Sequence, residues 1–76
     1  MIALTLYSRT GCHLCGEMLA DLEPLVSGKA RVEVVDIDDD PALILRFGPI
    51  VPVLMHGDEE LSRLRLDVDR VREILD

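Results

Sequence analysis

The only two cysteines of the chain, Cys12 and Cys15, are separated by His13 and Leu14. A short apolar run, residues 2–7, leads into this segment, and after Cys15 the apolar pattern becomes helical. If Cys12 stands at the start of that helix and Cys15 one turn further, the two sulfurs lie on the same side. Such a pair can form a disulfide or share a metal ion.

Cys12 is the candidate nucleophile and Cys15 the candidate resolving thiol. Only a thiolate attacks a disulfide, and an ordinary cysteine, with a pKa of about 8.5, is little ionised at neutral pH. The free N–H groups and positive dipole end of a helix stabilise a thiolate, and Arg9 and protonated His13 add positive charge. We therefore expect a lowered pKa for the Cys12 thiol. The alternative, two buried and inert cysteines, fits poorly with a junction between strand and helix.

The two histidines have less definite roles. His13 stabilises the thiolate or moves protons, or else it is an exposed residue of the first helical turn; the sequence leaves both open. We expect His56, at the end of a strand, to face solvent. A site made of Cys12, His13, Cys15 and His56 would resemble a zinc or iron–sulfur site, but structural zinc needs a second ligand pair at regular spacing. We therefore assign no metal.

The rest of the chain predicts the elements that position these cysteines. Strands are expected at 2–7, 31–37, 53–56 and 59–64, with a tight turn at 57–58. A stripe of Leu14, Met18, Leu22 and Leu25 predicts the first helix, which Pro24 kinks or marks as its last turn and Gly28 ends. The order β-α-β-α-β-β-α predicts an α/β fold, with a four-stranded mixed sheet flanked by helices, in one domain of residues 1–76.

Two shorter helices complete this order. Asp40 is placed to cap a helix over 42–47 with Pro41 at its first position, and Asp67 caps a final helix whose inward residues are Val68, Val71 and Leu75. The acidic run at 36 and 38–40 invites a calcium site, but Pro41 replaces the required glycine of an EF-hand loop. Helix capping and solvation explain the run better.

Composition restricts the partners. The chain has 15 acidic and 8 basic residues and a net charge of −7, which disfavours nucleic acid and anionic lipid. No apolar run approaches the ~20 residues of a membrane span. The first residues lack the pattern of a secretion signal. We expect a cytoplasmic protein, because in a reducing compartment a Cys-x-x-Cys pair is more often catalytic or metal-binding than structural.

Two motifs resemble those of the thioredoxin superfamily, and within it the small glutaredoxin-like proteins. They are Tyr7-Ser8-Arg9-Thr10-Gly11-Cys12-x-x-Cys15 and Ile50-Val51-Pro52-Val53-Leu54. The resemblance implies a thioredoxin-like fold in which a cis Pro52 faces the cysteines and leaves the backbone of Val51 free to pair with a substrate. It places Arg9 near the glycyl carboxylate of glutathione, and Arg46 within reach of a glutathione carboxylate.

The chain departs from typical glutaredoxins in two places. His13-Leu14 stands between the cysteines instead of Pro-Tyr, and Leu64-Arg65-Leu66-Asp67 replaces a Gly-Gly segment that helps to hold glutathione. We therefore expect weak affinity for glutathione.

The resulting hypothesis is a glutaredoxin-like thiol–disulfide oxidoreductase, acting on protein disulfides or glutathione. Cys12 and Cys15 are catalytic, Arg9, Val51 and Pro52 bind substrate, and His13 modulates the pair. We expect a monomer with no bound cofactor, with glutathione as a candidate co-substrate. The alternative is a binding or carrier module that docks a protein or holds a metal or cluster with little turnover.

Overall fold

Four strands form one mixed sheet in the order β2-β1-β3-β4 in the computed structural model, which describes all residues 1–76. The first pair, β1 (Ile2–Ser8) and β2 (Ala30–Asp36), is parallel, whereas β3 (Val53–His56) runs antiparallel to both β1 and β4 (Glu59–Arg63). Because a parallel pair needs a crossover, the first helix must return the chain to the start of the sheet. The predicted strand order along the chain and the mixed sheet are confirmed.

Three helices begin at side chains that accept hydrogen bonds from free backbone N–H groups. These are α1 (His13–Val26), capped by Cys12, α2 (Pro41–Phe47), capped by Asp40, and α3 (Val68–Leu75), capped by Asp67. The predicted caps at Asp40 and Asp67 accept from the second and third residues beyond them, at 2.9 and 3.2 Å. Each cap satisfies a donor that the helix leaves unpaired, which fixes where the helix starts.

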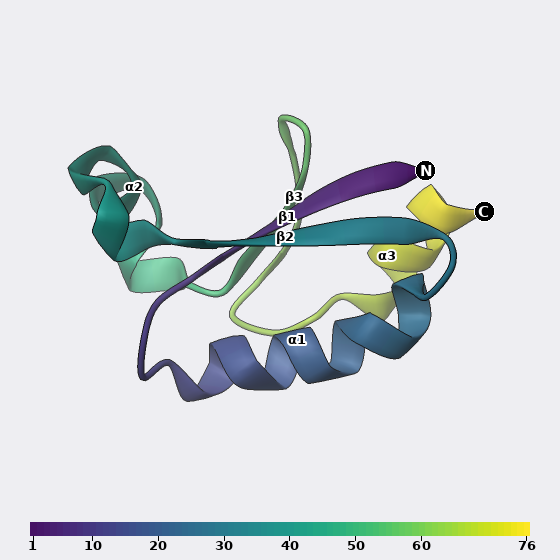
Figure 1. Ribbon diagram of the computed structural model, residues 1–76, viewed down its shortest axis with the longest axis horizontal. Helices are drawn as coiled ribbons and strands as arrows, with labels where there is room; N and C mark the ends of the chain where they lie inside the picture. The colour runs from purple at the N-terminus through teal and green to yellow at the C-terminus, as the bar shows by residue number, and fades with distance from the viewer.

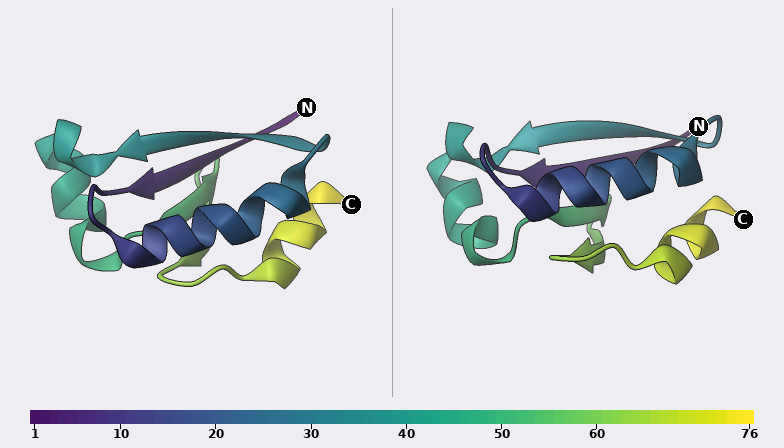
Figure 2. Two further views of the ribbon diagram at one scale, coloured as in Figure 1. Left: turned by 60° about the horizontal axis from the view of Figure 1, so that its bottom comes forward. Right: turned by 90° about the horizontal axis from the view of Figure 1, so that it is seen from below.

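The two longer helices, α1 and α3, pack on one face of the sheet (Figures 1 and 2). Their buried contacts with the strands form the larger part of the core, which contains Leu4, Leu6, Met18, Leu22, Val26, Leu54, Leu61 and Val71. Leu22 and Val71 are completely buried. Alternate residues of β1 supply the sheet side of this layer, as expected for the period of two in a strand.

The short helix α2 covers the opposite face at one end of the sheet, away from the two chain termini (Figure 1). Its Phe47 packs with Ile37, Val53 and Met55, and its ring stacks on Tyr7 with 4.4 Å between the centroids. Helices thus flank both faces of the sheet, which gives the predicted thioredoxin-like fold. The turn from β1 into α1 lies at the same end as α2 (Figure 2).

Some details differ from the sequence predictions. The second strand spans Ala30–Asp36 and Ile37 begins a single 3-10 turn, Ile37–Asp39, so the strand lies one residue earlier than predicted. A second 3-10 turn spans Gly48–Ile50. Val68, predicted to face inward, is exposed, because it is the first residue of α3 and lies at the edge of the core. Pro24 lies in the last turn of α1.

The structure contains no helix that is both long and apolar enough to cross a membrane.

Candidate functional site: the Cys12–Cys15 pair

Cys12 and Cys15 form a disulfide at the start of α1, with 5.2 Å between their Cα atoms. Cys15 is buried, at 6% exposure, whereas Cys12 is half-buried and therefore the more accessible of the two. Cys12 caps the helix through its sulfur: the N–H of Cys15 donates to Cys12 Sγ at 3.2 Å. The accessible sulfur is thus held against a free N–H at the positive end of the helix.

The start of α1 itself carries little negative charge. The first turn of α1 carries no acidic residue. His13 is 90% exposed and its Nε2 lies 3.2 Å from Glu17 Oε2, one turn further along the helix. Of the two interpretations left open for His13, this position favours an exposed first-turn residue that faces Glu17.

Arg9 forms an ion pair with the carboxylate of Asp38, a residue distant in the sequence. Its guanidinium donates from Nη2 to Asp38 Oδ1 at 2.6 Å and from Nε to both oxygens at 3.1 and 3.2 Å. These hydrogen bonds raise the pKa of Arg9 and hold the pKa of Asp38 below its usual value. The structure therefore brings Arg9 together with Asp38, which belongs to the acidic run that the sequence analysis attributed to helix capping and solvation.

A second contact ties the same two loops. Thr10 donates from Oγ1 to Asp36 Oδ2 at 3.2 Å, and Asp36 Oδ1 accepts from the N–H of Asp38 at 2.9 Å. Ser8 and Asp36 are register partners at the ends of the parallel strands β1 and β2. The sequence predicted that these two strands are connected by a parallel crossover. A parallel pair brings both strand ends to one edge of the sheet, where Thr10 meets Asp36.

Val51 and Pro52 precede β3 at the same end of the sheet, since Val53 pairs with Tyr7 near the end of β1. The Val51–Pro52 peptide bond is cis, and Pro52 is buried. Val51 lies outside the strands and helices and takes part in none of the backbone hydrogen bonds found outside them. Its backbone groups are therefore available to a ligand.

A comparison with known protein families shows the family of this chain. Residues 3–76 match the family described as Glutaredoxin-like domain (DUF836). The chain belongs to this glutaredoxin-like family. Among curated proteins, none matches the chain.

Solved structures share the fold of the chain. An X. campestris structural-genomics target protein is 36% identical, and the match covers 96% of this chain and 95% of that one with a TM-score of 0.73. A malarial protein matches over 100% and 99% of the two chains, at 15% identity and a TM-score of 0.64. A buckwheat glutaredoxin, solved in complex with glutathione, is 23% identical over 92% of this chain and 64% of its own, with a TM-score of 0.55. The last two likenesses show the fold.

Two other residues considered from the sequence, Arg46 and His56, make no hydrogen bond with either cysteine of this glutaredoxin-like protein. The guanidinium of Arg46 stacks over the Phe47 ring, 4.7 Å from its centroid. His56 is half-buried at the end of β3, before the 57–58 turn. No group of three or more His, Cys, Asp or Glu side chains gathers as a metal site.

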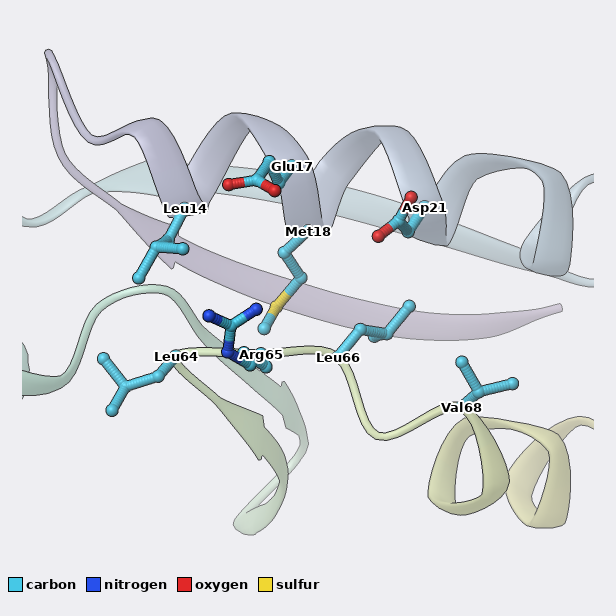
Figure 3. Close-up of a pocket in the computed structure, with 8 residues that line it drawn as sticks. All are labelled: Leu14, Glu17, Met18, Asp21, Leu64, Arg65, Leu66 and Val68. Atoms are coloured by element: carbon cyan, nitrogen blue, oxygen red, sulfur yellow. The ribbon is translucent and has the colours of Figure 1, made fainter.

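A groove that the sequence analysis missed lies between α1 and the connection from β4 to α3 (Figure 3). Its volume is about 280 Å³. Five of its lining residues are apolar: Leu14, Met18, Leu64, Leu66 and Val68. The charged ones are Glu17, Asp21 and Arg65. No sequence pattern revealed this groove, because its two walls are 50 residues apart at Leu14 and Leu64 and meet only in the folded chain.

Proposed function

We propose that this glutaredoxin-like protein is a thiol–disulfide oxidoreductase that cycles between the Cys12–Cys15 disulfide and the dithiol. One observation carries the proposal: the accessible Cys12 sulfur caps α1 and accepts the N–H of Cys15, whose own sulfur is buried behind it. A helix N-terminus stabilises a thiolate, and a thiolate is the attacking species in disulfide exchange. The pair thus has an accessible nucleophile, the half-buried Cys12, and a buried resolving thiol, Cys15.

The reaction begins with the dithiol form. The Cys12 thiolate attacks one sulfur of the substrate disulfide, forming a mixed disulfide and releasing the other sulfur as a thiolate, which takes up a proton. Cys15 then loses its proton and attacks the sulfur of Cys12. This step closes the Cys12–Cys15 disulfide and releases the second substrate thiol. Two electrons pass from the protein to the substrate, and the steps need no cofactor.

Val51 and Pro52 shape the substrate site in this proposal. The free N–H and C=O of Val51 at the end of the sheet offer an extended peptide the hydrogen bonds of an added strand. Arg9 acts mainly through Asp38, since the ion pair holds the segment before Cys12 against the 3-10 turn that follows β2. His13, exposed in the first turn of α1 beside Glu17, is the modulating residue of the proposal, because its protonated form adds positive charge to this end of the helix.

Glutathione enters the proposal as a weakly bound thiol. The buckwheat glutaredoxin was solved with glutathione, and this chain shares its fold. The connection at Leu64-Arg65-Leu66-Asp67 presents leucine side chains and no Gly-Gly segment. We therefore place protein disulfides first as substrates, and we place the reaction in a reducing compartment such as the cytoplasm.

Two cysteine variants test the reaction. Cys15→Ser keeps the nucleophile and removes the resolving thiol, so we expect it to accumulate a mixed disulfide with a disulfide substrate, seen as a mass increase on Cys12. Cys12→Ser should form no such adduct, because the remaining Cys15 is buried. A binding module with little turnover would instead keep its partner in both variants and trap no adduct. Equal adduct formation in the two variants would also contradict the assigned roles.

A further inference from the structure

We propose that the groove between α1 and the β4–α3 connection selects the substrate: a protein disulfide whose reacting cysteine has an apolar and a basic residue beside it. This inference rests on the proposed function, since it concerns the substrate of the same cysteines. The occupant is an extended segment of a basic protein. The position of the groove, the conformation of Leu64 and the charge of the rim support this occupant.

The groove begins at the Cys12–Cys15 segment. Leu14, which separates the two cysteines in the sequence, and Leu64 stand at one end, and Val68 stands at the other (Figure 3). Leu64 is joined to the Val51–Pro52 segment, because its N–H donates to the carbonyl of Pro52 at 2.8 Å. A peptide paired with Val51 would therefore place the residues next to its cysteine at the mouth of this groove.

Leu64 is held in a conformation that leucine rarely adopts. Its φ is +65°, and the N–H of Arg65 donates to the carbonyl of Arg63 at 2.6 Å, which closes a three-residue γ-turn around it. A bulky residue at positive φ is an outlier, and such strain gathers at ligand sites. The side chain remains 41% exposed at the groove instead of joining the core. An apolar wall is thus maintained beside the disulfide at a cost in backbone strain.

The charged rim favours a basic side chain. Glu17 and Asp21 lie one turn apart on α1, on the side of the helix that faces the groove (Figure 3). Asp21 is exposed and makes no side-chain hydrogen bond or ion pair with the rest of the chain, so its carboxylate is free to bind a cation. Arg65 supplies one positive charge, which leaves an acidic excess at the rim and adds to the net charge of −7. Such a field attracts cationic partners and repels anionic ones such as glutathione.

The size of the groove suits side chains of a peptide. Pockets for small ligands usually occupy about 300–1,000 Å³, and this one, at about 280 Å³, lies just below that range. Leu14 and Met18 point from α1 toward the connection, so the floor of the groove is apolar (Figure 3). One or two side chains of an extended segment fill such a space, with the apolar one on the floor and the basic one at the rim.

The test uses peptide disulfides of matched length. Each carries one cysteine capped as a disulfide with 2-mercaptoethanol, flanked by Leu and Lys, by Leu and Glu, or by Gly and Gly. Bis(2-hydroxyethyl) disulfide serves as a reference without side chains. Protein reduced with dithiothreitol and then desalted is the only reductant, so each turnover converts one dithiol to the Cys12–Cys15 disulfide and one peptide disulfide to two thiols. We expect the Leu–Lys peptide to react at least tenfold faster than the Gly–Gly peptide, and the Leu–Glu peptide to react more slowly than the Leu–Lys peptide.

Variants separate the two parts of the groove. Leu64→Gly removes the apolar side chain, and glycine adopts the positive φ of this residue readily. We expect this variant to reduce the Leu–Lys peptide less than threefold faster than the Gly–Gly peptide. Asp21→Asn should reduce the preference for Leu–Lys over Leu–Glu by several-fold. Asp58→Asn, which removes the same charge from the distant 57–58 turn, should keep both ratios. The ratios within one variant are unaffected by any general loss of activity.

The outcomes distinguish the inference from the proposed function. If the reference disulfide is reduced but all peptides react at equal rates, the groove does not select substrates, while the oxidoreductase proposal stands. Preferences that survive both Leu64→Gly and Asp21→Asn would likewise overturn the inference. If neither peptides nor reference disulfide are reduced, the proposed function fails, and the groove inference fails with it.

Discussion

The N–H of Cys15 donates to the sulfur of Cys12 at 3.2 Å, so the backbone of one cysteine supports the side chain of the other. After reduction, the same donor faces a thiolate at the positive end of α1. Hydrogen bonds to a charged group and a helix N-terminus both favour the charged form, so we expect the pKa of the Cys12 thiol to lie below about 8.5. The pH dependence of alkylation of Cys12 in Cys15→Ser measures this pKa.

The same shift links pH to the stability of the reduced protein. A thiol whose pKa is lower in the folded chain than in the unfolded chain stabilises the fold above the unfolded pKa, and this stabilisation is lost as pH falls through the folded pKa. The Cys12→Ser variant lacks this pH dependence and serves as the control. A Cys12 thiol that titrates at or above the ordinary value would contradict the assignment of Cys12 as the nucleophile.

The Arg9–Asp38 pair predicts a second pH effect. Hydrogen bonds from Arg9 hold the pKa of Asp38 below its usual value of 3.8. The contribution of the pair to stability is therefore complete above that value and is lost as pH falls through the lower folded pKa. Asp38→Asn should abolish this acid dependence and loosen the segment before Cys12, as measured by denaturant unfolding from pH 2 to 7 and by amide exchange at Gly11 and Cys12.

The neighbouring carboxylate supplies the control for that experiment. Asp39→Asn removes the same charge from the same run, but Asp39 is exposed and makes no side-chain hydrogen bond with Arg9. Because both partners of the Arg9–Asp38 pair are about 40% exposed, the effect should be small and should weaken with added salt. Identical behaviour of the two variants at low salt would show that the pair does not fix the loop.

The core between the sheet and α1 predicts a large stability difference between two leucines. Leu22 is completely buried under the sheet, whereas Leu45 on α2 is 86% exposed. Leu22→Ala should lower the free energy of unfolding by about 2–5 kcal/mol, because it leaves a cavity. Leu45→Ala should change it by less than about 0.5 kcal/mol. Urea denaturation measures both, and comparable losses in the two variants would contradict the packing described.

The sequence of the β4–α3 connection predicts weak glutathione binding. Leu64 and Leu66 stand where the resemblance to typical glutaredoxins implies a Gly-Gly segment, and acidic residues line the groove beside them. Isothermal titration of the oxidised protein with glutathione should give no binding tighter than the micromolar range. A submicromolar dissociation constant would show that the acidic groove does not exclude this anion.

Local patterns were sufficient to predict most of the fold. Asp40 and Asp67 identified helix starts because a cap acts on N–H groups only two or three residues away. The apolar runs predicted the strands for the same reason, since a strand shows its buried face through its own periodicity. The prediction that Val68 faces inward was wrong, because a residue in the first turn of α3 lies at the edge of the core, where periodicity does not determine burial.

Contacts between distant segments were not predictable in the same way. The partner of Arg9 lies 29 residues away, and only the parallel alignment of β1 with β2 brings Asp38 to it. The positive φ of Leu64 also left no signal, because positive φ is expected for glycine and this position is a leucine. The cysteine pair was predictable from the sequence, because its chemistry depends on a spacing of three residues at the start of one helix.

A redox titration of the purified protein in glutathione buffers of defined potential tests directly whether the Cys12–Cys15 pair is redox-active. Thiols are trapped at each potential and the products are weighed by mass spectrometry. We predict a reversible loss of two hydrogens, located at Cys12 and Cys15, with a midpoint between about −270 and −120 mV. A protein that shows no reversible oxidation in this window would not be a thiol–disulfide oxidoreductase.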